Sequence, residues 1–258
     1  PIESAFQPLI GGVITVVTLV LTLNQLVLSQ ELGAVGDQRE RMEGATEFRS
    51  DVADALGRDV TPPEPAAFLR ALVVTAGEHA DAVAAAGAGD DEFASDAEPL
   101  LDSVRGNAEA VADDLDGAQF GTFAVVSAAL DFNYSWKLYE TRRLQSDHDL
   151  TDDRATALSQ LADVLELFGP AREHFKTLYF QWELVNLSRA VLWGAIPALV
   201  ATLGAVLYLP SLVPAPPATG PYLMGPLLVS LAAAIGLLPF AILLSYVLRI
   251  ATVTKRTL

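Results

Sequence analysis

The chain has 258 residues, of which 52% are hydrophobic and 19% are charged, and it contains no cysteine. Disulfides and thiolate metal sites are therefore excluded. The formal net charge is −16. The sequence contains no basic patch that could neutralise the phosphates of a nucleic acid, so we expect no nucleic-acid partner.

The charges divide the chain into parts of opposite character. Residues 30–186 hold 31 acidic and 12 basic residues, a net charge of −19, whereas residues 187–258 hold four basic residues and no acidic one. Lysine occurs only at Lys137, Lys176 and Lys255. Acidic surfaces with little lysine stay hydrated in concentrated salt, which favours an extremely halophilic source; an ordinary acidic domain is the alternative.

The first predicted element is a membrane-spanning helix over Leu9–Leu28, which carries no charged side chain. About 20 apolar residues cross the hydrocarbon core of a bilayer as a helix. Helical spacing continues through residues 30–56, so we expect the span to run into the acidic segment without a break. The chain begins with Pro1 rather than Met, and a fourth span upstream of it is left open.

The acidic segment has the patterns of a helical bundle. A helix is predicted to begin at Thr61-Pro62, and a second to cover residues 92–115. The apolar run 120–130 is too short to cross a bilayer, so we expect a central buried helix that continues to Leu144; a re-entrant membrane segment is the alternative.

A further helix is predicted to begin at Thr151-Asp152, with its inner face formed by Leu158, Leu161, Val164, Leu165 and Phe168. Gly169-Pro170 predicts a kink or a short break. The helical pattern of residues 171–209 then leads directly into the second uncharged stretch, Ala190–Val213. A Pro-rich turn over residues 210–221 joins it to the third, Tyr222–Leu248.

The predicted fold is therefore all-α, with three membrane spans and an acidic helical bundle inserted between the first and the second. We expect an entry segment and first span over residues 1–29, the bundle over residues 30–186, and a membrane hairpin with a basic tail over residues 187–258. Basic residues flank one end of every span: Arg39, Arg41, Arg172, Lys176, Arg189, Arg249, Lys255 and Arg256. The positive-inside rule then places residues 30–186 in the cytoplasm of a multi-pass cell-membrane protein.

No catalytic motif is present, and we expect neither an enzyme nor a cofactor. The three histidines, His79, His148 and His174, form no zinc motif. Neighbouring acidic residues are typical of solvated faces and helix starts. No phosphate-binding glycine loop occurs, since the glycines of residues 84–90 lack the Lys and Ser/Thr of a P-loop.

Small residues at helical spacing in the spans allow close helix contacts, either within one subunit or between subunits. They are Ala190, Gly194 and Ala198 in the second span, and Ala232 and Gly236 in the third. Asn24 and Gln25 are candidates for helix contact or, with Thr18 and Thr22, for lining a pore. Pro197 and Pro239 are candidate hinges, because each leaves one backbone carbonyl without its helical donor.

The run FGPAREHFKTLYFQWELVNLSRA, residues 168–190, resembles stretches of uncharacterised helical membrane proteins from extreme halophiles. The resemblance implies a membrane protein and carries no activity, cofactor or site residue with it.

Two functions follow from these patterns. The first is a membrane-anchored interaction, scaffold or sensor protein that works through its acidic cytoplasmic bundle. The second is a subunit of an oligomeric channel or pore, because three or four helices cannot enclose a water path alone. The expected partners are the lipid bilayer and either a second copy of the chain or another membrane protein.

Overall fold

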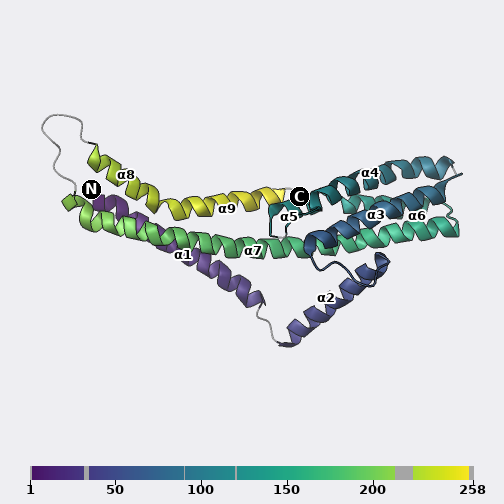
Figure 1. Cartoon of the computed structure of the whole chain (residues 1–258), viewed down its shortest axis with the longest axis horizontal. Coiled ribbons are helices and arrows are strands. Elements are labelled where there is room, and N and C mark those ends of the chain that lie inside the picture. Colours follow the sequence, from purple (N-terminus) through teal and green to yellow (C-terminus); the bar gives the residue numbers. More distant parts are fainter. Residues whose placement is uncertain (1, 32–34, 90, 120, 213–222, 256–258) are drawn as a thin grey trace. The chain divides into compact units, whose positions relative to one another are not determined.

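The computed structural model describes residues 2–31, 35–89, 91–119, 121–212 and 223–255 (Figure 1). All regular elements in these ranges are α-helices. The chain divides into two compact units. We call Pro1–Leu32 with Gln181–Leu258 the membrane unit, and Gly33–Phe180 the helical domain.

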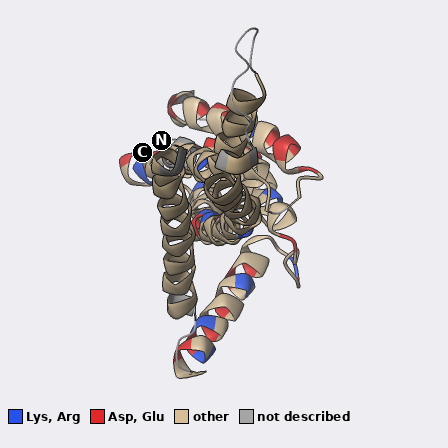
Figure 2. Cartoon of the chain, turned by 90° about the vertical axis from the view of Figure 1, so that its left-hand side faces the viewer, with Lys and Arg blue, Asp and Glu red and all other residues tan. Residues whose placement is uncertain are grey.

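The membrane unit contains α1 (Ile2–Glu31), the last part of α7 (Asp152–Leu212), α8 (Met224–Gly236) and α9 (Leu238–Lys255). Helix α1 is long and apolar enough to cross a membrane over Ser4–Ser29, and α7 also contains such a segment. In Figure 2, α1 is tan along nearly its whole length, whereas α2 carries both red and blue residues. The described chain thus has two candidate spans, or up to three when α8 and α9 are counted as one.

The third predicted span is not one straight helix. Helices α8 and α9 meet at an angle of 42° around Leu237. Pro239, two residues later, has no backbone N–H to continue the helical hydrogen bonds, which accounts for the break. The Pro-rich turn was predicted over residues 210–221, and most of these residues lie outside the described part of the chain. Val213, the predicted end of the second span, lies outside it too.

The membrane unit has apolar side chains on its outer surface as well as inside. Along α7, one face is buried at Val191, Ala195, Ala198 and Ala205, while Trp193 on the other face is 75% exposed. The exposed stripe continues through Ile196, Val200, Leu203 and Leu207. A soluble surface rarely presents so large a continuous apolar area, whereas lipid favours it.

The helical domain contains α2 (Val35–Ala55), α3 (Pro65–Gly87), α4 (Asp91–Leu115), α5 (Phe123–Asp131), α6 (Tyr134–Asp147) and the first part of α7. Helices α3 and α4 pack along each other, and α4 also contacts α5 and α6. One apolar core joins these helices. The predicted inner face of α7 is confirmed, since Leu158, Leu161, Val164, Leu165 and Phe168 are all buried.

The prediction of one central helix over residues 120–144 is wrong. The chain forms α5 and α6 with a break at Phe132-Asn133. Asn133 begins the second helix, because its side chain accepts a hydrogen bond from the backbone N–H of Trp136. The break turns Phe132 into the core, where its ring packs edge-on against Phe168 at 4.8 Å.

Several predicted boundaries also differ. Helix α3 begins at Pro65 rather than at Pro62, and it extends to Gly87. Helix α7 continues through Gly169-Pro170, so of the two predicted alternatives, a kink or a short break, the break does not occur. The predicted continuity between the first span and α2 falls on residues 32–34, which lie outside the described residues.

Candidate functional site

Asn24 and Gln25, which were predicted together, lie on different faces of α1. The side-chain amide of Asn24 donates a hydrogen bond to the hydroxyl of Ser188 on α7, and that hydroxyl donates to the backbone carbonyl of Leu184. Gln25 is exposed. A helical turn takes 3.6 residues, so consecutive side chains point about 100° apart. Of these two amides, Asn24 is therefore the one that joins α1 to another helix of the membrane unit.

A second polar link joins α7 to α9. Arg249 donates a hydrogen bond to Glu183 over 2.9 Å, and Glu183 is only 4% exposed. Glu183 lies five residues before Ser188, so both polar links fall within two turns of α7. Local sequence patterns carry no signal for this pair, because its members are 66 positions apart.

Three of the predicted small residues are buried against other helices of the same chain. A Cβ atom on Gly194 would lie 2.8 Å from Cδ1 of Ile242 on α9. A Cβ atom on Gly236 would overlap the side chain of Leu9 and lie 2.7 Å from Cγ2 of Thr202. Ala198 is fully buried, whereas Ala190 and Ala232 are half-buried.

The two candidate hinges have different surroundings. Pro239 is buried beside the bend between α8 and α9. Pro197 is exposed within α7, which continues through it as one helix. The bend at Pro239 is a feature of the fold, and movement about either proline stays a prediction.

The threonines proposed as pore lining are exposed, but their hydroxyls are engaged. Those of Thr18 and Thr22 donate to the carbonyls of Ile14 and Thr18, four residues earlier in the same helix. Such bonds satisfy a hydroxyl in lipid without a second helix or water. Thr18, Thr22 and Gln25 lie on one exposed face of α1, since they are spaced at i, i+4 and i+7. Asn24 lies on a different face.

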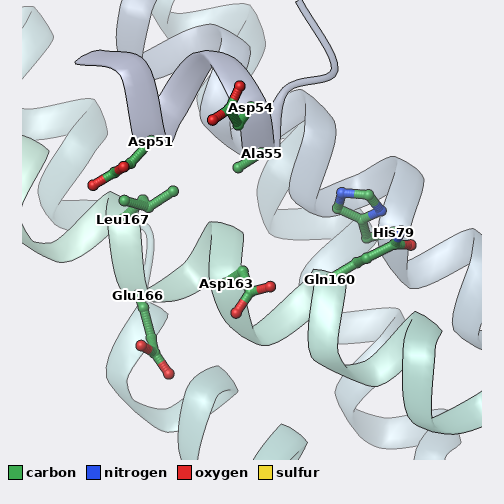
Figure 3. Close-up of a pocket in the computed structure, with 8 residues that line it drawn as sticks. All are labelled: Asp51, Asp54, Ala55, His79, Gln160, Asp163, Glu166 and Leu167. Atoms are coloured by element: carbon green, nitrogen blue, oxygen red, sulfur yellow. The ribbon is translucent and has the colours of Figure 1, made fainter. Parts of the chain in front are cut away.

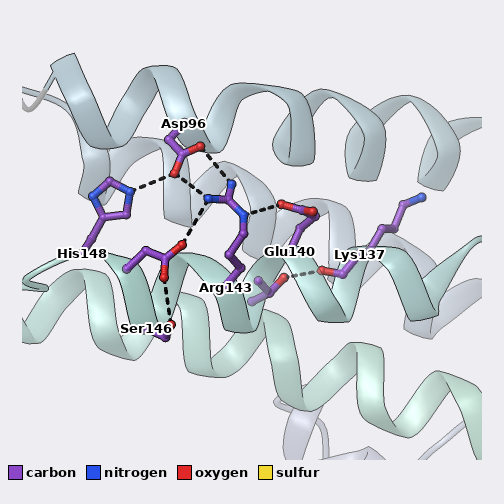
Figure 4. A network of polar contacts seen from close by, with 8 residues as sticks. Asp96, Lys137, Glu140, Arg143, Ser146 and His148 are labelled. Atoms are coloured by element: carbon purple, nitrogen blue, oxygen red, sulfur yellow. Dashed lines mark hydrogen bonds and ion pairs between the residues drawn. The ribbon is translucent and has the colours of Figure 1, made fainter.

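In the helical domain, a network of charged side chains connects α4 to α6 (Figure 4). Asp96 accepts hydrogen bonds from both terminal nitrogens of Arg143, at 3.0 and 2.9 Å, and its carboxylate also lies 3.0 Å from Nε2 of His148. The bond from Arg143, followed by that from His148, lowers the pKa of Asp96 to about 2. Glu140 also accepts from Arg143. This geometry cross-links two helices.

A buried lysine lies nearer the start of α6 than Arg143 does. Lys137 is 2% exposed, and its ammonium donates to the side-chain oxygen of Asn107 at 3.0 Å and lies 5.0 Å from the ring centre of Phe132. Asn107 also donates to the carbonyl of Asp131. Lys137 and Asn107 thus hold α4, α5 and α6 together. Burial lowers the pKa of Lys137 to about 8.

A hollow of about 490 Å³ in the helical domain is lined mainly by acidic side chains. Figure 3 shows Asp51 and Asp54 from α2, His79 from α3, and Asp163 and Glu166 from α7. Glu166 is already paired with Arg142. Among the described residues, no group of three His, Asp or Glu side chains is arranged to hold a metal ion. The hollow is therefore a solvated acidic surface.

The helices and their surfaces define the class of the chain: an all-helical protein with two or three candidate membrane spans and a separate helical domain. The chain belongs to a family of unknown function, DUF7972, whose model matches residues 1–258. No curated protein and no solved structure matches the chain significantly.

Proposed function

We propose that this protein is a membrane-anchored sensor or scaffold whose working part is the helical domain, held in the cytoplasm. The observation that carries the proposal is α7, a single helix of 61 residues. Its first part supplies Leu158, Leu161 and Leu165 to the core of the helical domain, and its last part supplies Val191 and Ala198 to the core of the membrane unit. At this connection, the chain passes from the helical domain to the membrane unit within one helix and without a loop.

The packing of the membrane unit supports an anchor better than a pore. Close contacts at Gly12, Gly194 and Gly236 are filled by side chains of the same chain. The hydroxyls of Thr18 and Thr22 are bonded to their own helix, and Asn24 is bonded to Ser188. The remaining exposed side chains of the described spans are largely apolar, which suits contact with lipid.

A cross-linking experiment in the source cells tests the proposal. A photoreactive amino acid is placed in the full-length chain at Glu109, on the surface of α4, and in a matched variant at Trp193, on the apolar face of α7. We expect the Glu109 variant to capture one defined partner repeatedly, and the Trp193 variant to capture lipid. Capture of only a second copy of the chain at both positions, together with ion flux in proteoliposomes, would instead support the pore.

The cytoplasmic position is tested separately by protease protection. In sealed, right-side-out cells or vesicles, added protease should leave the helical domain intact, whereas permeabilised samples should be cleaved. The expectation rests on the basic residues that flank the predicted inner ends of the spans. Digestion of the domain in intact cells would reverse the proposed orientation.

A further inference from the structure

A second hollow of the helical domain differs from its neighbours in both shape and charge. It has a volume of about 410 Å³ and lies among α2, α3 and α7. Its lining consists of Arg41, Ala45, Phe48, Arg49, Phe68, Pro170, Ala171, His174 and Phe175. A volume of this size is within the range of small-molecule sites, about 300–1,000 Å³.

The charge of this lining is opposite to that of the domain around it. The hollow is lined by two arginines and a histidine and by no carboxylate. Each of four other hollows in the domain is lined by at least two carboxylates. In a segment with a net charge of −19, this lining is therefore a locally basic surface that favours an anion.

The walls of the hollow are aromatic. The ring of Phe68 packs edge-on against Phe175 at 5.7 Å and is tilted against Phe48 at 6.3 Å. Phe68 and Phe175 are buried, so the position of these rings is fixed by the core. An apolar ligand of planar shape would gain contact area here with little loss of side-chain freedom.

Arg49 is held in position over these rings. Its guanidinium carbon lies 5.4 Å from the ring centre of Phe68. One terminal nitrogen donates to the hydroxyl of Thr61 at 3.1 Å and to the carbonyl of Pro62 at 3.3 Å. Within the described part of the chain, the other terminal nitrogen and Nε make no hydrogen bond. These two nitrogens form the edge that binds a carboxylate with two parallel hydrogen bonds.

The neighbouring cations on α7 do not contribute in the same way. Arg172 and Lys176 both pair with Glu173, and the guanidinium of Arg172 lies 4.8 Å from the ring centre of Tyr134. Neither residue is part of the lining. The polar recognition of a ligand in the hollow therefore depends on Arg49, with His174 also in the lining.

We propose that this hollow binds a small carboxylate with an aromatic body, with the carboxylate on Arg49 and the ring against Phe48. The proposal rests on the proposed sensor function and names the class of ligand that the domain would detect. Because α2 and α7 both line the hollow, a bound ligand would connect the start of the domain to the helix that continues into the membrane unit.

The test measures the binding of the probe indole-3-acetate to the full-length protein in nanodiscs by calorimetry. We expect saturable binding that Arg49→Gln weakens at least tenfold. The matched control is Arg39→Gln, which removes the same charge from the same helix at a residue whose guanidinium pairs with Glu43 outside the hollow. It should leave the affinity within twofold. The neutral probe indole-3-acetamide should bind at least tenfold more weakly than the carboxylate.

Three outcomes would overturn the proposal. They are no binding by the folded wild-type protein at millimolar probe, equal losses in Arg49→Gln and Arg39→Gln, and equal binding of the acid and the amide. Circular dichroism of each variant shows whether it is folded. If Arg49→Gln does not bind the probe and the Glu109 cross-linking partner is still captured, the hollow and the interaction role are separate. If the partner is never captured while the probe binds, the interaction role fails and the site stands.

Discussion

Lys137 is the residue whose surroundings depart furthest from what its side chain would suggest. It is almost fully buried, and its charge is compensated by Asn107 and by the face of Phe132. Lysine is rarely buried in folded proteins, and the sequence around this position has no feature that distinguishes it from an exposed lysine. The break between α5 and α6, which folds Phe132 inward, creates this environment.

The buried Lys137 should make the stability of the domain depend on pH. Its pKa is about 8 in the folded chain and 10.5 in the unfolded chain, so between these values the unfolded chain binds more protons. Stability therefore rises with pH in this window, by at most about 1.4 kcal/mol per pH unit. Denaturation followed by circular dichroism should show this rise for the wild type relative to Lys137→Met. Parallel curves for the two proteins between pH 8 and 10 would contradict the prediction.

Asp96 should produce a pH dependence of the same sign in acid, because folding lowers its pKa as well. Hydrogen bonds from Arg143 and then His148 lower its pKa from 3.8 to about 2, so the stabilisation is complete above the unfolded value and is lost as the pH falls towards 2. Asp96→Asn should lower the free energy of unfolding by about 1 kcal/mol at pH 7. The value is small because solvent screens the charge of this partly exposed carboxylate. The difference from the wild type should disappear near pH 2. Asp102→Asn on the same helix, which removes a longer contact of 3.8 Å to Arg105, should be nearly neutral.

At the scale of helices, the packing of the membrane unit depends on close contact at Gly236. Gly236→Ala should lower the stability of the full-length protein in micelles by about 1–3 kcal/mol, because the new methyl group overlaps Leu9 and Thr202. Gly204→Ala is the matched control within a span, since a Cβ there meets nothing within 4 Å. Thermal unfolding followed by size-exclusion chromatography should separate the two variants. Equal melting temperatures would show that the contact can relax.

The sequence predicted those features of the helices that depend on local patterns. The spacing of Leu158, Leu161 and Leu165 indicated the inner face of α7, and the lack of charge in residues 9–28 indicated the first span. The break before α6 was missed because apolar and aromatic residues continue through it, which favours one long helix. The cap at Asn133 was the available signal.

Other features could not be predicted from local patterns, because they depend on residues far apart in the chain. Glu183 and Arg249 meet only when α7 and α9 pack. The hollow around Arg49 likewise combines residues of α2, α3 and α7. The net charge of the domain does not reveal this basic lining, because the lining depends on where the charged residues lie in the fold and not on their number.

At the scale of the whole molecule, the acidic domain should require salt. Its charges repel each other over a screening length of about 10 Å at 0.1 M salt and about 3 Å at 1 M. We propose that the protein is adapted to concentrated salt, and expect the helical signal of the domain to fall as KCl is reduced from molar to decimolar. Circular dichroism that is unchanged across this range would favour an ordinary acidic domain.

The membrane unit is built from two stretches separated in the chain by the entire helical domain. During translation, α1 enters the bilayer before its partner helices exist. At about 5–20 residues per second, the ribosome needs on the order of 10 s to complete the intervening domain. Over this time Ser188 does not yet exist, so the hydrogen bond from Asn24 that joins α1 to α7 can form only after the whole helical domain has been synthesised.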